Sequence, residues 1–340
     1  MEPSSHASVS SQPEWLDSYQ HLTAQCGLAD VSSRSRVELT GADRVQFLHS
    51  FCTNDIKRLK PGEGCEAFLT NHQGKTVGHV YVRILPAAIV LDTAPGQAKG
   101  IIDHLSRFVI SDRVDFRDLT PLTGELLIAG KLAPQLLAKL NIEPLPAGLF
   151  QSRQFTLAGK GVSVQRTDYA GEFSYFLTVA VEDFAEILKT LRDAGIPNCE
   201  SPAVEAARIE AGVPLFGCDI TEENLPQEIN RDRQAISFTK GCYLGQETVA
   251  RIDALGHVNR LLAVVKFSSA DIPSAGTELM AGDKPVGKVT SACWSPRFAG
   301  PLAFALLRRG NSSPGTTLTS LSGPAEVISL PLLPATAASS

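Results

Sequence analysis

The chain has 340 residues, of which 43% are hydrophobic and 20% charged, and its formal net charge is -5 at pH 7. At about 100–200 residues per domain, this length predicts two or three domains, each able to bury a core. The acidic balance argues against a nucleic-acid binder that works through a broad basic face. No stretch approaches about 18 uninterrupted apolar residues, so we expect no membrane partner.

The N-terminal residues, MEPSSHASVSSQPEW, contain no apolar segment of the kind that a secretory signal needs. They also lack arginine until Arg34, which argues against a mitochondrial transit peptide. We therefore expect a cytoplasmic protein. Residues 1–12 are rich in Ser and Pro and are expected to form a disordered tail.

Residues 13–121 are expected to form an N-terminal α+β domain. Apolar residues at helical spacing, or a proline near a helix start, predict three helices, over 13–26, 42–52 and 96–111. Alternation predicts strands at 36–41, within 64–94 and at 112–120. The sequence NHQGK at 71–75 is a hairpin signal between two of them.

Residues 122–200 are predicted to contain a second set of alternating strands and helices. A strand at 124–130 precedes a helix at 133–141, a hairpin with a long polar turn follows at 155–180, and a helix at 181–195 ends at Gly195. Strand, helix, two strands and helix in this order predict a ferredoxin-like α+β unit.

Residues 201–260 are expected to connect this unit to a last domain. Their first helix, 201–212, has Ser201 as its expected cap, Pro202 at its first position and Glu205 in the place of a capping box. Residues 261–334 then contain four predicted strands separated by Gly, Pro and Ser clusters, which is typical of a small β-barrel or sandwich, and the chain is expected to fray after Pro334.

The most unusual segment is SFTKGCYLGQETVAR, residues 237–251. Cys242 follows Lys240 between two glycines, and GQETVARIDA predicts a helix directly after it. A cysteine at a helix N-terminus beside a lysine is in a setting that favours the reactive, metal-binding thiolate. The alternative is a glycine-rich turn in which this cysteine has no function.

Two further segments could bind a ligand. Glu172 follows a glycine in the polar turn YAGE, and a carboxylate accepts two parallel hydrogen bonds from the N–C–N edge that pterins and guanines present. Arg208, in RIEAG, could hold a ligand carboxylate through its planar fork. The alternatives are a solvated turn glutamate and an ion pair between Arg208 and Glu205 on one helix.

Other site classes lack support. The seven cysteines form no CxxC, and the histidines show no HxH or HExxH spacing, so neither a disulfide framework nor a metal site is expected. The sequence contains no GxxxxGK[ST] phosphate loop, no GxGxxG after a strand, and no GxSxG.

Together these segments resemble the folate-binding family of the glycine cleavage T protein (aminomethyltransferase), over residues 22–309. GLADVSSRSRVELTGADRVQFLHSFCTNDIKRL is similar to the family's opening, and RTDYAGEFSYFL and ARIEAGVPLFGCDI are similar to two internal segments. The most specific match is KGCYLGQE, which resembles the signature of the YgfZ-type branch, whose members are linked to iron–sulfur cluster assembly and repair.

The resemblance implies an α+β fold of three domains around a central opening that binds a tetrahydrofolate species. Iron–sulfur client or assembly proteins would be its partners. By position, Glu172 would hold the pterin edge and Cys242 would be the signature functional cysteine and candidate catalytic residue. The remaining candidates for the folate site are Tyr169, Arg208, Asn54 and Lys240.

One departure from the family pattern concerns activity. In T proteins the segment after the hairpin carries an acidic pair, one member of which is catalytic, whereas Gly78 and His79 stand there in this chain. Histidine cannot replace a carboxylate that stays anionic at neutral pH. We therefore expect a folate-binding protein that serves iron–sulfur proteins. The alternatives are a folate-dependent aminomethyltransferase or demethylase, and a scaffold with a vestigial cleft.

Overall fold

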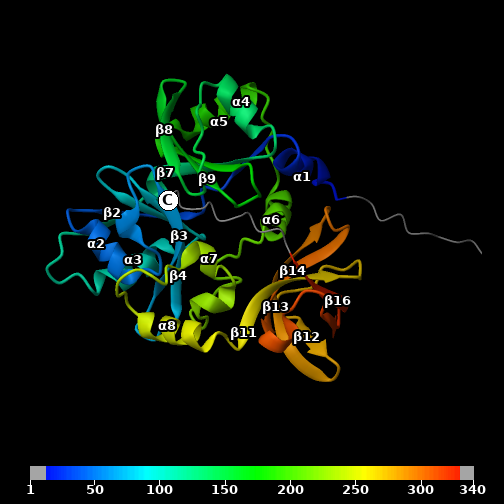
Figure 1. Ribbon diagram of the computed structural model, residues 1–340. Coiled ribbons are helices and arrows are strands. Elements are labelled where there is room, and N and C mark those ends of the chain that lie inside the picture. Colours follow the sequence, from blue (N-terminus) through cyan, green and yellow to red (C-terminus); the bar gives the residue numbers. More distant parts are fainter. Residues whose placement is uncertain (1–12, 330–340) are drawn as a thin grey trace, which may run out of the picture.

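The computed structural model describes residues 13–329. Two five-stranded sheets and a closed six-stranded barrel surround a central group of helices (Figure 1). The tail expected at 1–12 and the residues expected to fray after Pro334 lie outside the described residues. Within them, no helix is both long and apolar enough to cross a membrane.

The first sheet is antiparallel throughout, and helices α2 (Arg44–Phe51) and α3 (Ala98–Ser106) cover one of its faces. The helix and strand segments predicted for this region are confirmed, and a short 3-10 turn, η1 (Ile56–Arg58), follows α2. In spatial order the strands are β3 (Gly64–Thr70), β4 (Thr76–Ile84), β5 (Ile89–Thr93), β2 (Ser35–Thr40) and β6 (Asp115–Asp118).

The second sheet is also antiparallel, and helices α4 (Ala133–Lys139) and α5 (Phe184–Asp193) cover one of its faces. In spatial order the strands are β1 (Gly27–Asp30), β7 (Thr123–Ala129), β10 (Ser174–Ala180), β9 (Lys160–Thr167) and β8 (Ser152–Leu157).

The ferredoxin-like pattern is present in the order β7-β10-β9 with α4 and α5, while β1 from the start of the chain fills the place beside β7. The predicted hairpin over 155–180 is wrong in one respect, because it contains three strands. Ala158 and Gly159 both have positive φ, 51° and 77°, and form a tight turn between β8 and β9. The sequence pattern predicts a single strand across this turn.

The two uncovered sheet faces pack against each other. The Tyr81 ring on β4 lies 6.5 Å from the Phe176 ring on β10, between ring centroids. Further along the same strands, Arg83 donates a hydrogen bond of 3.1 Å to the hydroxyl of Thr178. The N-terminal two thirds of the chain therefore forms four layers, helix, sheet, sheet and helix, with polar groups inside.

The C-terminal unit is a closed antiparallel barrel around an apolar interior. The sequence predicted four strands, but the barrel has two more. These two were not predicted because each has only four residues, too few to show a pattern of alternation. In spatial order the strands are β11 (Arg260–Phe267), β14 (Gly300–Arg308), β13 (Lys284–Ser295), β12 (Glu278–Ala281), β15 (Thr317–Ser320) and β16 (Gly323–Ile328).

Short helices link the sheets to the barrel. Helix α6 (Ser201–Glu210) packs on α1 (Leu16–Thr23) and on β13, and so joins the N-terminal helix to the barrel (Figure 1). The other short helices are η2 (Thr120–Leu122), η3 (Val181–Asp183), η4 (Pro226–Ile229), α7 (Asp232–Ala235), α8 (Gln246–Leu255) and η5 (Arg309–Asn311).

The predicted capping of α6 is wrong. Ser201 lies inside the helix, Glu200 precedes it, and no side chain caps its start. Glu205 forms no capping box because its carboxylate accepts a hydrogen bond of 2.8 Å from Nε of Arg208. A buried arginine three residues away offers this carboxylate a charged partner, and a charged hydrogen bond is stronger than a bond to a backbone N–H.

Candidate functional site

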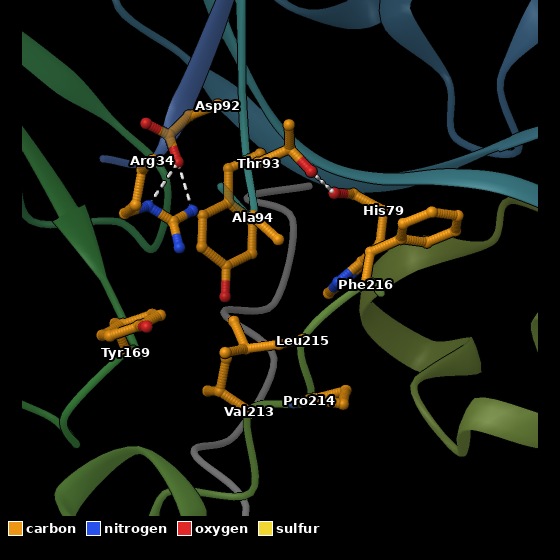
Figure 2. A pocket seen from close by; sticks show the side chains of 11 residues that line it. Arg34, His79, Asp92, Thr93, Ala94, Tyr169, Val213, Pro214, Leu215 and Phe216 are labelled. Atoms are coloured by element: carbon orange, nitrogen blue, oxygen red, sulfur yellow. Dashed lines mark hydrogen bonds and ion pairs between the residues drawn. The ribbon is translucent and has the colours of Figure 1, made fainter. Parts of the chain in front are cut away.

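A pocket lies where the first sheet, the loop between β9 and β10, and the segment after α6 meet (Figure 2). The space left between its side chains is only about 10 Å³, enough for one water molecule. Most of the side chains that fill it are charged or aromatic near the sheets and apolar on the segment after α6. The residues that line it are Arg34, His79, Tyr81, Asp92, Thr93, Ala94, Tyr169, Val213, Pro214, Leu215 and Phe216.

Arg34 and Asp92 form the charged side of this pocket (Figure 2). Nε of Arg34 donates to Oδ1 of Asp92 over 2.8 Å, and its guanidinium lies over the rings of Tyr169 and Phe176 at 4.9 and 4.8 Å. Burial is the largest single influence and acts to lower the pKa of Arg34, but Asp92, Tyr169 and Glu125 together outweigh it, so that the pKa is raised. Oδ2 of Asp92 is buried and has no hydrogen-bond partner among residues 13–329.

His79 lies on the opposite side of the pocket. Its Nε2 is 2.6 Å from Oε1 of Glu66, and its ring stacks on Phe68 with 5.0 Å between centroids. Arg231 donates to both oxygens of Glu66 and, over 2.6 Å, to Asp168. Burial acts to raise the pKa of Glu66, but Arg231 and His79 outweigh it and lower the pKa to about 2.

A larger cavity of about 650 Å³ lies on the other side of the turn between β9 and β10. Glu172 on that turn is exposed to it and makes no hydrogen bond or ion pair within residues 13–329. Lys131 and Arg297 are exposed at the same cavity. Glu210 also faces it, but its carboxylate already accepts hydrogen bonds from the hydroxyls of Tyr19 and Ser295.

The turn therefore divides two residues that the sequence placed in one folate site. Tyr169 is buried in the central pocket, and Glu172, three residues later, lines the larger cavity. Gly171, with φ of 100°, lets the chain reverse between them.

Arg208 is a buried structural link and has no free donor. Its Nε and Nη2 bind Glu205, and its Nη1 donates to the carbonyl of Val213 over 2.6 Å. The remaining donors reach Asp219 and Ser291 at 3.0 and 3.1 Å. Because a guanidinium has five N–H groups, all are used within the protein.

Asn54 and Lys240 likewise bind protein groups. The amide nitrogen of Asn54 donates to the carbonyls of Glu66 and Gln234, both over 2.8 Å. Nζ of Lys240 donates to the carbonyls of His49, Cys52 and Asn54 at 2.5, 2.7 and 3.0 Å, which uses all three of its donors. Together they fasten the loop around residue 240 to the first sheet.

Cys242 is exposed on the loop before α8. The helix expected after it is confirmed, but it begins at Gln246, four residues beyond the cysteine. Lys240 directs its ammonium to backbone carbonyls of another segment. The two features expected to favour a thiolate at Cys242 therefore act elsewhere, although the cysteine itself is accessible.

Sequence reasoning missed most of the charged residues around the central pocket. The signal for them was a single charged residue inside an otherwise apolar strand, which is uncommon unless its charge is paired. The strands CEAFL and IVLDT each carry one such carboxylate, Glu66 and Asp92.

Known protein families match the chain in two parts, which agree with the sheets and the barrel of the structure. Residues 3–240 match the model of the GCVT N-terminal domain, and residues 260–333 match that of the glycine cleavage T-protein C-terminal barrel domain. The crystal structure of glycine cleavage system aminomethyltransferase T from Bartonella henselae superposes with a TM-score of 0.84. It is 22% identical and covers 94% of this chain and 89% of its own.

Two curated relatives illustrate the sequence similarity. "Putative transferase At1g60990, chloroplastic" of Arabidopsis thaliana is 27% identical over 320 residues, which is 92% of this chain and 71% of that protein. An aminomethyltransferase of Thermus thermophilus is 28% identical over 324 residues, which is 93% of this chain and 90% of that protein. With both domain models matched and the fold shared, this chain belongs to the glycine cleavage T-protein (GcvT-like) family.

Proposed function

We propose that this protein binds a tetrahydrofolate species in the cavity that Glu172 lines, and that it serves iron–sulfur proteins rather than glycine cleavage. The observation that carries the folate assignment is the carboxylate of Glu172, which faces a cavity of about 650 Å³ and has no hydrogen-bond or ion-pair partner within residues 13–329. An unpaired carboxylate at a cavity is available for a ligand.

The chemistry of the cavity fits a folate. A pterin offers an N–C–N edge whose donors match the two oxygens of one carboxylate. The volume falls within the roughly 300–1,000 Å³ of small-molecule sites. Lys131 and Arg297 would pair with the carboxylates of the glutamate tail.

The central pocket supports a role other than aminomethyl transfer. His79 occupies the position that the family's acidic pair takes, and its Nε2 is engaged with Glu66. The space of about 10 Å³ also leaves no room for a transferred group beside these side chains.

One observation favours the alternative, a folate-dependent aminomethyltransferase. Oδ2 of Asp92 is buried in the central pocket without a partner among the described residues, and this carboxylate lies on the strand next to that of His79. The names of the curated relatives support the same alternative. The activity test below therefore includes Asp92.

For the iron–sulfur role, the accessible group is Cys242. Its thiol is exposed on a loop that Lys240 fastens to the end of α2 and the segment after it, so it stands at a fixed place on the surface. Thiolates are ligands of iron–sulfur clusters, and an exposed thiol can reach a client protein.

Anaerobic titration calorimetry with tetrahydrofolate tests the folate assignment. Glu172→Ala should weaken binding at least tenfold, since it removes a charged hydrogen bond worth about 1.5–3 kcal/mol. Glu182→Ala removes another exposed carboxylate outside the cavity and should bind like the wild type. Equal affinity of the Glu172 variant and the wild type would contradict the assignment, and no binding by either would support a scaffold.

A further inference from the structure

A further pocket, of about 190 Å³, lies between the two sheets, beyond Tyr81 on the same face of β4. Its apolar walls include Leu85, Val90 and Leu119, and it reaches solvent beside Gln154 and Gly161, which are exposed on the β8–β9 hairpin. Apart from Gln154, the polar residues that line it are Arg36, Arg83, Thr123, Ser163 and Thr178. None of them takes part in the central pocket or in the Glu172 cavity.

Arg83 is the unusual member of this set, because it is only 3% exposed and yet unpaired. Its Nη1 donates to the hydroxyls of Thr178 and Ser163 at 3.1 and 3.4 Å. Its Nε is buried without any hydrogen-bond partner, and no carboxylate oxygen of residues 13–329 lies within 4.0 Å of its guanidinium. Burial accordingly lowers the pKa of Arg83.

The other buried arginines among the described residues differ from Arg83 in having a carboxylate partner. Each has a carboxylate within 4.0 Å, as expected for a charge that has been removed from water. The pairs are Arg34 with Asp92, Arg36 with Glu125, Arg208 with Asp219, and Arg231 with Glu66.

The nearby carboxylates do not supply the missing charge. Oδ1 of Asp92 is bound to Arg34. Glu125 is bound to Arg36 and Thr178, and it also lies within 4.0 Å of Arg34. Asp92 and Glu125 therefore face three buried arginines, Arg34, Arg36 and Arg83, so the positive charge exceeds the negative charge even with both carboxylates ionised.

We propose that this inter-sheet pocket binds a small anionic group, a phosphate or a carboxylate head, with Arg83 as its anchor. The fork of the guanidinium suits two oxygens of either group, and the hydroxyls of Thr178 and Ser163 lie beside it. The apolar walls suit a ligand with a short hydrocarbon part next to its charged head. The bound anion balances the charge that the protein leaves uncompensated.

Thermal unfolding of the full chain tests this proposal, with inorganic phosphate and butyrate as separate probes and chloride to hold ionic strength constant. The wild type should show a saturable rise in Tm with one probe or both, because a ligand that binds only the folded state stabilises it. A response to phosphate alone identifies an oxyanion site, and a response to butyrate alone identifies a carboxylate site.

Arg83→Met should lose the saturable rise, and without probe it should be at least as stable as the wild type, since it removes an unpaired buried charge. Arg83→Lys keeps the charge but not the fork, and should weaken the response at least tenfold in probe concentration. Arg153→Met, at an exposed arginine on β8, serves as the control and should respond like the wild type.

The proposal fails if the wild type shows no saturable response to either probe, or if both Arg83 variants respond like the wild type. Calorimetric titration of the wild type with the same probes gives a second measurement that does not depend on any variant folding. Arg83→Met should bind tetrahydrofolate like the wild type, so failure here is distinguishable from failure of the folate proposal.

Discussion

Nε2 of His79 lies 2.6 Å from Oε1 of Glu66, and both side chains are buried. Glu66 also receives two hydrogen bonds from Arg231, so one carboxylate holds two cationic or hydrogen-bonding partners at the centre of the molecule. This arrangement ties the first sheet to the segment before α7.

Glu66→Gln should destabilise the protein by about 3–5 kcal/mol, because it leaves Arg231 with only Asp168 as a charged partner in a buried place. Urea unfolding measures the change. Glu247→Gln alters an exposed glutamate of α8 and should change the free energy of unfolding by less than about 0.5 kcal/mol. If the free energy of unfolding falls by less than about 1 kcal/mol in Glu66→Gln, Glu66 is not the buried partner on which the Arg231 charge depends.

The same carboxylate predicts a dependence of stability on pH. Its pKa in the folded protein is lowered to about 2, against about 4.3 when unfolded. The stabilisation is therefore complete above about pH 4.3 and is lost as the pH falls towards about 2. Unfolding measured from about pH 5 to about pH 2 should show this loss in the wild type and a flatter profile in Glu66→Gln, and parallel profiles would contradict it.

Replacement of the acidic pair predicts that the purified protein does not form methylenetetrahydrofolate from an aminomethyl-lipoyl carrier. Turnover should stay below about 1 per second, the lower end of ordinary enzyme rates. A faster rate would favour the aminomethyltransferase alternative. In that case Asp92→Asn should abolish the activity, since Asp92 is the carboxylate that lines the central pocket and its Oδ2 has no hydrogen-bond partner among the residues that the structure describes.

Lys240→Met should destabilise the protein by about 3 kcal/mol or more. The change leaves the carbonyls of His49 and Cys52 without their ammonium donor, and each unsatisfied buried acceptor costs about 1–3 kcal/mol. Urea unfolding checks this, with Lys57→Met at a neighbouring exposed lysine as the control. If the variant is as stable as the wild type but the thiol of Cys242 reacts more slowly, Lys240 acts on that thiol and not on the fold.

Much of the fold could be predicted from the sequence, because the pattern of apolar residues depends on local geometry. The alternation in HVYVRIL predicts most of β4, and the turn at NHQGK marks where β3 ends and β4 begins. The pairing of β7 with β1 could not be predicted in this way. β1 is nearly a hundred residues away and only four residues long, and no local pattern indicates such a pairing.

The site was less predictable for a related reason. Motif similarity named Arg208 and Lys240, but their donors are used by carbonyls and carboxylates that only the folded chain brings near. The accessible carboxylate of Glu172 could be named from its place in a turn. The unpaired state of Arg83 could not, because it depends on what the opposite sheet lacks.

Cys242 should be the first cysteine to react with iodoacetamide. It is exposed on the loop before α8, whereas burial raises the pKa of each of the others. Those with raised pKa values are Cys26, Cys52, Cys65, Cys199, Cys218 and Cys293.

The closest competitor is Cys218, which is also exposed, but its sulfur lies 3.6 Å from the carbonyl of Thr290 and its pKa is raised to about 11, chiefly by burial. Labelling the folded protein across pH, with mass spectrometry of the modified peptides, should therefore give one fast site. Cys242→Ser should remove it, and Cys218→Ser should leave it unchanged. Fast labelling of Cys218 or Cys52 with Cys242 protected would mean that the loop is closed in solution, and the iron–sulfur role would lose its accessible thiol.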